Sequence, residues 1–402
     1  MKHVIIGAGP AGVNAAAMLR QMNPQDAIIM FSGENTPPYA KMVLPYLLAG
    51  VVEEKNLHLP IPEGVLLHTG RRVVRIDPQR QSVETDDGKT VFYDRLLIAT
   101  GGVPEKPTIE GHALPFVATI RDLPDVRRIQ ERLQGKTGHA VIAGAGPVSM
   151  ETGDALHRLG MKITFIVSSN RVFSMMLDRP AAAFVEDRLR QQGVDVLKGE
   201  DIARIDAEGK VTLQSGTTIP CDLVIFGKGV NPCIHFLAGS GLALRRGILV
   251  DEYMETNIPG VFAAGDAVEA RDLIAGEQRV NALWPVAVEQ GRVAARNMAG
   301  VPATYEGSVA RNILRVFGLS ILVAGMGRAD GPDVRVFSGP DFYHKIVLDG
   351  GVLKGFIFIG EIRREGLYRN LLQRQIDITP FTDAVHKGNF NYSRYQRWAM
   401  RL

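Results

Sequence analysis

The chain has 402 residues, of which 46% are hydrophobic and 22% are charged, and its formal net charge is +3 at pH 7. Because domains usually run to roughly 100 to 200 residues, this length predicts two or three domains rather than one core. The small net charge argues against a general nucleic-acid binder. No apolar run reaches the ~20 residues of a membrane helix, and the N-terminal residues show no signal-peptide pattern. We therefore expect a cytoplasmic protein that does not insert into a membrane.

The chain contains two cysteines, Cys221 and Cys233. Two are too few for a disulfide framework or a cysteine-ligated metal cluster, and their spacing is not that of a C-x-x-C motif. We therefore predict no metal site and expect that any redox chemistry depends on a bound cofactor.

The N-terminal residues predict a dinucleotide-binding unit, since a strand, a glycine turn, a helix and a second strand follow one another in HVIIGAGPAGVNAAAMLRQM and AIIMFSGE. Gly7, Gly9 and Gly12 form the pattern G-x-G-x-x-G. Gly7 permits the tight turn, Gly9 lets the backbone approach a pyrophosphate, and Gly12 lets the helix pack closely. The acid expected about 20 residues further on falls on Glu34, our candidate for the ribose. The alternative for Glu34 is a solvated loop glutamate.

The same pattern returns in HAVIAGAGPVSMETGDALHRLGMKITFIVSSN, which predicts a second dinucleotide-binding unit. Gly144 and Gly146 are retained, and the third position is Ser149, which is still small enough for close packing. The following strand ends at Val167 without a carboxylate for a 2'-hydroxyl, and Arg171 is the nearby group for a 2'-phosphate. The sequence does not decide between NAD(H) and NADP(H). It favours NAD(H), because a 2'-phosphate usually needs several charge-assisted bonds.

Three later apolar strands end in glycine-containing turns: RLLIATGG at 95–102, DLVIFGKG at 222–229 and GVFAAGDA at 260–267. A helix is expected from Trp284 to Met298. From about residue 303 the pattern changes to short alternating segments, such as HKIVLDGGVLKGFIFIG, in which a DGG turn joins two strands.

These elements predict an α/β fold with two Rossmann-like three-layer dinucleotide-binding domains and a C-terminal α+β domain. We place the first dinucleotide-binding domain at 1–110 and 240–302, the second dinucleotide-binding domain at 111–239, and a C-terminal interface or docking domain at 303–402.

GAGPAG, RLLIATGG, the second glycine motif and GVFAAGDA, in this order, resemble the FAD- and NAD(P)-dependent pyridine-nucleotide oxidoreductases over essentially the whole chain. The resemblance implies that the first glycine motif holds FAD, that the second holds the nicotinamide cofactor, and that the chain crosses between the domains at Thr100 and Gly101. It also implies that Asp266 bonds the ribityl chain of FAD and that Val73 contacts the adenine through its backbone. An acid in this position can accept a sugar hydroxyl, and capping of a turn is the alternative for Asp266.

Two further segments resemble stretches that, in members of this family, lie near the flavin or nicotinamide ring. ALWPVAVEQGRVAA resembles the helix whose N-terminus, marked here by Pro285 and Ala287, faces the pyrimidine side of the flavin. A helix dipole there stabilises negative charge at flavin N1. Glu151 matches a family glutamate near the flavin and nicotinamide rings, and an exposed glutamate in the first turn of the helix is the alternative.

The segment PPYAKMVLPYLLAG resembles the stretch in which disulfide-reducing members and some NADH oxidases carry a redox cysteine. Met42 takes that position here, and a thioether cannot form a thiolate or a sulfenic acid. We therefore expect no redox-active cysteine. Lys41 matches the basic residue that rubredoxin- and ferredoxin-reductase-like members place near flavin N5, where a cation favours the reduced flavin. A surface lysine is the alternative.

The last hundred residues resemble the C-terminal domain of the nitrite-reductase NADH-binding module, without cysteines that could hold an iron–sulfur centre. The chain ends in the basic and aromatic segment HKGNFNYSRYQRWAMRL, which is either a docking element or a surface helix packed on its own domain. Its candidate docking residues are Lys387, Arg394, Tyr395, Arg397 and Trp398.

We predict a flavoprotein that passes a hydride between NAD(H) and FAD and exchanges electrons with an iron–sulfur partner, ferredoxin- or rubredoxin-like, or with a subunit of a larger oxidoreductase of the 2-oxoacid or tungsten aldehyde type. The alternatives are a self-contained NADH oxidase or peroxidase and an NADH-responsive redox sensor resembling apoptosis-inducing factor. Homo-oligomers and hetero-oligomers both stay open.

The predicted site residues are Lys41 and Glu151 for catalysis; Gly7, Gly9, Pro10, Ala11, Gly12, Glu34, Lys41, Val73, Ala99, Thr100, Gly101, Gly265, Asp266, Pro285 and Ala287 for FAD; and Gly144, Gly146, Val148, Ser149, Glu151, Val167, Ser168 and Gly229 for NAD.

Overall fold

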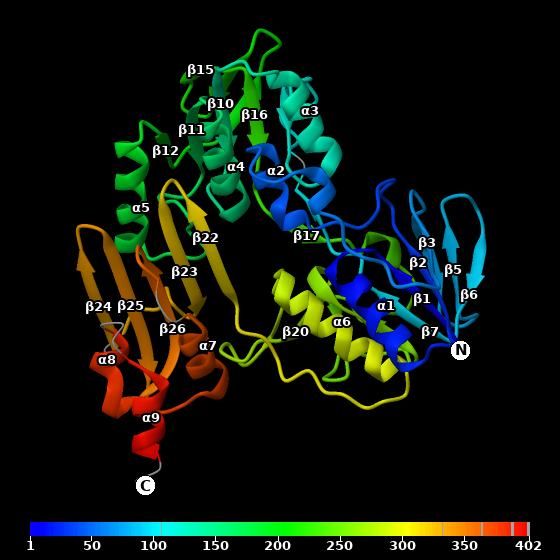
Figure 1. Ribbon diagram of the computed structural model, residues 1–402. Coiled ribbons are helices and arrows are strands. Elements are labelled where there is room, and N and C mark those ends of the chain that lie inside the picture. The colour runs from blue at the N-terminus through cyan, green and yellow to red at the C-terminus, as the bar shows by residue number, and fades with distance from the viewer. Residues whose placement is uncertain (106, 332, 363–364, 387–389, 400–402) are drawn as a thin grey trace. The chain divides into compact units, whose positions relative to one another are not determined.

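The computed structural model describes residues 1–402 except 106, 332, 363–364, 387–389 and 400–402 (Figure 1). The chain divides into two compact units. The first contains Met1–Val43, Val52–Pro104 and Val230–Ser308, and the second contains Leu44–Val51, Glu105–Gly229 and Val309–Leu402. The last hundred residues thus group with the second glycine motif, and 44–51 group with the second unit although we assigned them to the first domain. The division into three domains stays a prediction.

A five-stranded parallel sheet forms the centre of the first unit, in the order β19-β7-β1-β2-β3. Its strands are short and apolar because both faces are covered, and the middle residues of β1 are fully buried. The strands are β1 (Lys2–Ile6), β2 (Ala27–Phe31), β3 (Val65–His68), β7 (Arg95–Ile98) and β19 (Val261–Ala263).

Two helices of the first unit, α1 (Pro10–Met22) and α6 (Trp284–Met298), pack against each other. A Cβ at Gly291 of α6 would overlap the backbone of Ala11, so small residues are what allow this approach. The predicted bounds of α6 are confirmed. The smaller elements of the unit are η1 (Lys41–Val43), η2 (Glu54–Asn56), β4 (Val73–Asp77), β5 (Ser82–Thr85), β6 (Thr90–Phe92), β8 (Gly102–Pro104), β17 (Val230–Pro232), η3 (His235–Leu237), β18 (Ile248–Leu249), η4 (Gly265–Ala267), β20 (Val268–Arg271) and β21 (Gln278–Arg279).

The second unit repeats the parallel arrangement in a sheet of order β12-β11-β10-β16-β9. The strand after the glycine helix pairs with the strand before it in both sheets, which confirms the predicted duplication of the β-α-β unit. The elements are α2 (Leu44–Leu48), β9 (Val117–Ala118), α3 (Leu123–Leu133), β10 (His139–Ala143), α4 (Pro147–Arg158), β11 (Lys162–Val167), α5 (Arg179–Gln191), β12 (Asp195–Lys198), β13 (Ile202–Ile205), β14 (Lys210–Leu213), β15 (Thr218–Pro220) and β16 (Leu223–Phe226).

The second unit also contains an antiparallel sheet built from the C-terminal residues, in the order β22-β23-β26-β25-β24 (Figure 1). The predicted DGG hairpin is confirmed, since β25 and β26 pair across Gly350 and Gly351. The mixed α/β fold with two parallel Rossmann-like sheets and an added α+β portion is therefore confirmed. The elements are β22 (Arg311–Val316), β23 (Leu319–Gly325), β24 (Val334–Gly339), β25 (Phe342–Asp349), β26 (Val352–Ile359), α7 (Glu365–Arg374), η5 (Thr379–Phe381), α8 (Thr382–His386) and α9 (Tyr392–Ala399).

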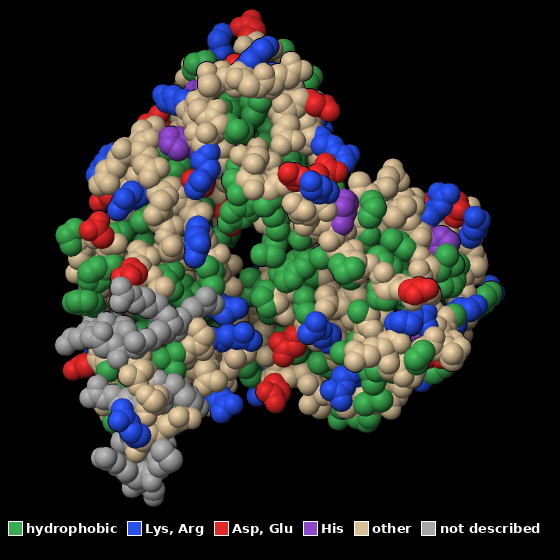
Figure 2. Space-filling model, viewed as in Figure 1, with side chains coloured by type: hydrophobic (Ala, Val, Ile, Leu, Met, Phe, Trp, Pro, Cys, Tyr) green, Lys and Arg blue, Asp and Glu red, His purple; other side chains and the backbone are tan. Residues whose placement is uncertain are grey.

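The surface carries charges of both signs. On the face that Figure 2 shows, Lys and Arg side chains stand among Asp and Glu side chains in each unit. Over the described residues, the search for a helix long and apolar enough to cross a membrane finds none.

Candidate functional site

The first glycine loop lies between β1 and α1 and has one open position. Gly7 has φ +108°, and a Cβ on it would overlap the carbonyl oxygen of Ala99. A Cβ on Gly12 would likewise overlap the carbonyl oxygen of Gly7. A Cβ on Gly9 would meet no atom within 4 Å. Gly7 and Gly12 are therefore required by packing, whereas Gly9 faces open space.

The open side of Gly9 is also the N-terminal end of α1. Gly9 is the N-cap in extended conformation, no side chain caps the helix, and Pro10 follows as a first helical residue. The first N–H groups of a helix lack partners within the helix and bind anions such as a pyrophosphate. The residues here fit a dinucleotide phosphate, because the cradle is open and its donors are main-chain groups.

Next to this loop, the end of β7 is tied to a later part of the first unit. The Thr100 hydroxyl donates a hydrogen bond of 2.8 Å to the carbonyl of Cys233, and the Cys233 N–H donates to the carbonyl of Gly101 at 2.9 Å. Gly101 has φ +69°, a conformation that favours glycine. The two adjoining strands, β8 after Gly101 and β17 before Cys233, pair antiparallel.

The end of β19 brings Gly265 and Asp266 to the same region. Gly265 has φ +83°, and its N–H donates a 2.8 Å bond to the side chain of the buried Gln290 in α6. Pro285 is one of the first residues of α6, and Ala287 is buried near the Cα of Gly265. The half-buried Asp266 follows Gly265 and lies in the same part of the first unit as the start of α6.

At the end of β2 the structure joins two predicted site residues that sequence reasoning treated separately. Glu34 accepts a hydrogen bond of 2.6 Å from the hydroxyl of Tyr39 and forms an ion pair with Lys41. Both members of the pair are 31% exposed. Our sequence analysis assigned no role to Tyr39. Val73, the predicted adenine contact, begins β4 and is buried.

The second glycine loop, between β10 and α4, has the same backbone shape. Gly144 has φ +108°, a Cβ on it would lie 2.5 Å from the carbonyl oxygen of Gly227, and a Cβ on Gly146 would meet no atom within 4 Å. The third position differs, since the buried Ser149 donates a 3.0 Å bond to the carbonyl of Gly227. Our sequence analysis did not single out Gly227. Its position in the glycine-containing turn of DLVIFGKG could have indicated it.

Beside α4, Val148 is 50% exposed and Gly229 has φ +99° with open space around its Cα. At the end of β11, Val167 is buried and Ser168 is exposed. Gly146 and Gly229 thus both have open space beside them, and Val148 at the start of α4 is exposed.

Glu151, the fifth residue of α4, is half-buried. Burial, followed by the negative charge of Asp154, raises the pKa of Glu151 to about 7. Burial and the charge of Glu151 also raise the pKa of Tyr46 in α2, a residue that our sequence analysis did not single out. A half-buried carboxyl that titrates near neutrality can hold or release a proton at physiological pH.

The sulfur-containing residues are separated. Met42 is 58% exposed in the first unit. Cys221 is buried in the second unit, where burial raises its thiol pKa to about 12, and Cys233 is half-buried in the first unit. The structure describes both cysteines as free thiols.

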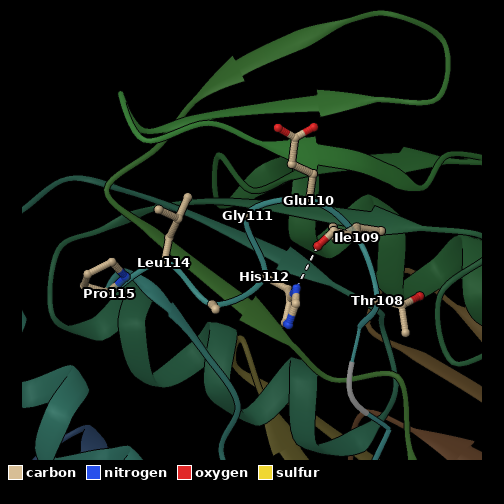
Figure 3. A pocket seen from close by; sticks show the side chains of 8 residues that line it. Thr108, Ile109, Glu110, Gly111, His112, Leu114 and Pro115 are labelled. Atoms are coloured by element: carbon tan, nitrogen blue, oxygen red, sulfur yellow. Dashed lines mark hydrogen bonds between the residues drawn. The ribbon is translucent and has the colours of Figure 1, made fainter.

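A hollow of about 450 Å³ is lined by residues 108–115 in the second unit (Figure 3). His112 bends back there onto the carbonyl of Ile109 at 2.8 Å, and Gly111 has φ +81° against the backbone of Ile205. None of the predicted site residues lines this hollow. Over the described residues, the search for a group of three or more His, Cys, Asp or Glu that could hold a metal finds none.

The C-terminal segment forms α9, and part of it packs on its own domain. The Tyr395 ring lies 6.2 Å from that of Phe381 and 6.4 Å from that of Phe390, whereas Arg397 is exposed. These ring contacts favour the surface-helix alternative. Lys387 and the side chains of Arg394 and Trp398 lie outside the described residues.

The chain is similar to known proteins over most of its length. The model of the pyridine nucleotide-disulphide oxidoreductase family matches residues 1–291. The epsilon subunit of the NADH-dependent phenylglyoxylate dehydrogenase of Aromatoleum evansii is 30% identical over 393 residues, which cover 94% of this chain and 93% of that protein. Nitrite reductase [NAD(P)H] of Bacillus subtilis is 30% identical over 389 residues, which cover 94% of this chain and 48% of that protein. The chain therefore spans about half the length of that relative.

Among solved structures, the NADH:rubredoxin oxidoreductase of Clostridium acetobutylicum is similar with a TM-score of 0.79 and 25% sequence identity. The similarity covers 94% of this chain and 96% of that one.

Proposed function

The chain belongs to the pyridine nucleotide-disulphide oxidoreductase family, whose members are flavoproteins that bind FAD and NAD(H), and on this premise we propose that it passes a hydride between the two cofactors and exchanges electrons with an iron–sulfur partner. The observation that carries the proposal is the pair of glycine loops, one in each unit, in which the second glycine alone faces open space. Two separate phosphate cradles fit two dinucleotides in one chain.

In the first unit, we assign the FAD pyrophosphate to the open side of Gly9 and the N-terminus of α1. Asp266 would accept a hydrogen bond from a hydroxyl of the ribityl chain, and the helix dipole at the N-terminus of α6 would favour negative charge on the flavin ring. Glu34 accepts ribose hydroxyls at the end of β2. Bound FAD supplies the conversion between two-electron and one-electron transfer. The protein residues bind and orient it.

The ion pair with Glu34 bears on the role of Lys41. Lys41 is paired with Glu34, which we assign to the ribose, whereas the resemblance places the corresponding basic residue near flavin N5. The pair supports a role in which Lys41 and Tyr39 orient Glu34 for the ribose. The position near flavin N5 stays a prediction from the resemblance.

In the second unit, we assign the NAD pyrophosphate to the open side of Gly146 and the N-terminus of α4. Glu151 lies one helical turn further along the same helix, and its pKa of about 7 supports a role in holding or releasing a proton near the nicotinamide. Arg171 donates to the carbonyls of Leu177 and Ser174, each at 3.1 Å, which supports NAD(H) over NADP(H) because the guanidinium already has partners.

We propose that electron transfer here needs no thiol. Met42 stands where disulfide-reducing relatives carry a cysteine, and the raised pKa of Cys221 keeps that buried thiol protonated at neutral pH. Cys233 is held through its backbone to Thr100 and Gly101. An acceptor outside the chain follows from this, and the similarity to a dehydrogenase subunit and to a rubredoxin oxidoreductase supports an iron–sulfur protein. The cytoplasmic location stays a prediction.

The test is an anaerobic assay in which the FAD-loaded chain is mixed with NADH and with rubredoxin or a [2Fe–2S] ferredoxin. We expect faster reduction of the iron–sulfur protein than of dioxygen in a parallel aerobic assay. The double variant Cys221→Ser with Cys233→Ser is expected to retain the wild-type rate, since no thiol takes part. Faster reduction of dioxygen than of the iron–sulfur protein would contradict the proposal and support the NADH oxidase alternative. A change of assembly state with NADH and no electron transfer would replace it by the sensor alternative.

A further inference from the structure

The segment 168–178 connects β11 to α5 and lies at the strand end where a Rossmann fold contacts the adenosine half of its nucleotide. We call this segment the adenosine loop. Its backbone is strained at Phe173, and its side chain at Met175 is exposed. Phe173 has φ +48° although it is 2% exposed, and Met175 is 78% exposed. A buried aromatic residue with positive φ persists where its surroundings impose the conformation.

The adenosine loop is connected directly to the second glycine loop. The N–H of Phe173 donates a 2.9 Å hydrogen bond to the carbonyl of Ala145, which stands between Gly144 and Gly146. The N–H of Val172 donates a 3.1 Å bond to the carboxylate of Glu186 in α5. A displacement of the adenosine loop would therefore reach the phosphate cradle.

The C-terminal sheet holds the end of this loop through a buried ion pair. Asp178 is the N-cap of α5 and accepts a 3.0 Å bond from the N–H of Ala181 through Oδ1. Through Oδ2 it accepts a 2.7 Å bond from Lys345 Nζ and a 3.2 Å bond from the hydroxyl of Tyr343, both from β25. The side chains of Lys345 and Asp178 are 2% and 10% exposed. Buried charges of this kind are held only with good geometry and additional hydrogen bonds.

Two more contacts join the same sheet to the nucleotide-binding part of the unit. Arg328, just after β23, donates a 2.9 Å bond to the carbonyl of Ser174 in the middle of the adenosine loop. At the other end of α5, the side chain of Gln192 donates a 2.7 Å bond to the carbonyl of Phe317, in the turn between β22 and β23. The C-terminal sheet thus contacts α5 at both its ends.

From these contacts we propose that Lys345 and Arg328 are positioning residues for the nicotinamide cofactor, so that the C-terminal sheet forms part of the support of the adenosine-binding site. The inference rests on the proposed function, which assigns the second glycine loop to NAD(H). Lys345 fixes the loop through Asp178 and Arg328 fixes it through the carbonyl of Ser174. Neither residue touches the nucleotide in this proposal.

The test variant is Lys345→Met, and its matched control is Lys354→Met. Lys354 is a half-buried lysine of β26 in the same sheet, and it donates to Gln375, away from the adenosine loop. Arg328→Ala is a second variant at the surface, where the loss of one hydrogen bond does not endanger folding. All variants are compared at equal FAD content.

The first readout uses ADP-ribose, which carries the adenosine half without the nicotinamide. We expect Lys345→Met to raise the Kd of ADP-ribose and the KM for NADH by the same factor, about tenfold, with kcat unchanged. Arg328→Ala is expected to raise the Kd of ADP-ribose and the KM for NADH about threefold, a smaller effect that lies within the usual range of coupling energies. Lys354→Met is expected to change neither. A general loss of structure would lower kcat and FAD content as well.

The second readout does not depend on activity or on the nucleotide. In amide hydrogen exchange, residues 172–177 are expected to exchange faster in Lys345→Met than in wild type, while β10 exchanges at the same rate in both. Wild-type exchange in this segment, or an ADP-ribose Kd that does not change with the KM for NADH, would overturn the proposal. If the wild-type chain bound no ADP-ribose, the assignment of NAD(H) would be wrong, and the exchange data would still test the contact with the sheet.

Discussion

The two glycine loops of this chain solve the same packing problem with different residues. In the first unit the third position is Gly12, and the residue that follows the neighbouring strand β7 is Ala99. In the second unit these places hold Ser149 and Gly227. The places correspond, because Ala99 donates its N–H to the residue before Gly7 at 2.8 Å and Gly227 donates its N–H to the residue before Gly144 at 2.9 Å.

The side chain and the glycine have thus exchanged places between the two loops. A Cβ on Gly227 would overlap the hydroxyl of Ser149, just as a Cβ on Gly12 would overlap the backbone of Gly7. In the second unit the close approach of helix and sheet therefore depends on two facing positions together, Ser149 and Gly227. A glycine motif read along one segment of sequence shows only one of them.

A second difference lies two residues further along each helix. Asn14 in α1 donates a 2.9 Å bond to the carbonyl of Pro10, whereas the same place in α4 holds Glu151. The first helix thus carries a neutral side chain where the second carries a half-buried carboxyl with a raised pKa. This difference fits a binding role for the first unit and a proton-handling role for the second.

The largest expected effect separates the two cradles. Because Gly9 and Gly146 both have negative φ, valine fits the backbone and its side chain enters the open space where a pyrophosphate is expected. We expect Gly9→Val to fold without FAD, and Gly146→Val to retain FAD while losing ADP-ribose affinity. Flavin absorbance and calorimetric titration measure the two properties. Full FAD retention in Gly9→Val would contradict the assignment of the first loop.

The next effect tests the exchanged pair. Gly227→Ala places a methyl group against the hydroxyl of Ser149, and we expect the free energy of unfolding to fall by about 2 kcal/mol, the usual cost of overpacking. The double variant Gly227→Ala with Ser149→Gly has the small-residue pattern of the first loop, and it is expected to regain most of the loss. Urea unfolding measures both. A loss in the double variant equal to the sum of the losses in Gly227→Ala and in Ser149→Gly would show that the two positions are not coupled.

The smallest effect concerns Glu151 and pH. Its folded-state pKa of about 7 lies above the ordinary value of 4.5, so the folded chain binds the proton more tightly than the unfolded chain does. Stability from this group falls as pH rises from 4.5 to 7 and stays constant above. We expect Glu151→Gln to match wild type at pH 4.5 and to be more stable by about 1 kcal/mol above pH 7, with solvent screening reducing the full effect.

Unfolding free energies measured between pH 4.5 and 8 check this prediction. The control is Asn14→Asp, which introduces a carboxyl at the corresponding place in the first helix. A difference between wild type and Glu151→Gln that does not change with pH would mean that the pKa of Glu151 is the same in the folded and unfolded chains, which contradicts the prediction.

The parts of the fold that depend on local sequence could be predicted, and the parts that depend on distant pairs could not. The glycine loops, the bounds of α6 and the DGG hairpin follow from turn residues and apolar periodicity within short segments. The pairing of Lys345 with Asp178 joins residues 167 positions apart, and no pattern near either one indicates it. The same holds for Gly227 opposite Ser149, since facing positions are known only once the strand order is known.

In the candidate site, even a contact between residues close in sequence could not be predicted. The sequence indicated Glu34 and Lys41 separately, seven positions apart, but their pairing depends on how residues 32–41 turn after β2. The segment 37–50 read as one motif, yet its chain path leaves the first unit after Val43. A motif of contiguous residues does not reveal such a crossing.

The interleaving of the two units along the chain fixes the order in which their parallel sheets can be completed during synthesis on the ribosome. The strands of the second parallel sheet are all made once residue 226 has emerged. The first unit, although it begins at Met1, still awaits β19 and α6, and α6 ends at Met298. Its early strands therefore wait with an uncovered edge while the later sheet is being completed. The N-terminal half of the gene thus encodes no finished domain, and a truncated transcript that ends between residues 226 and 261 would leave the N-terminal sheet without its last strand.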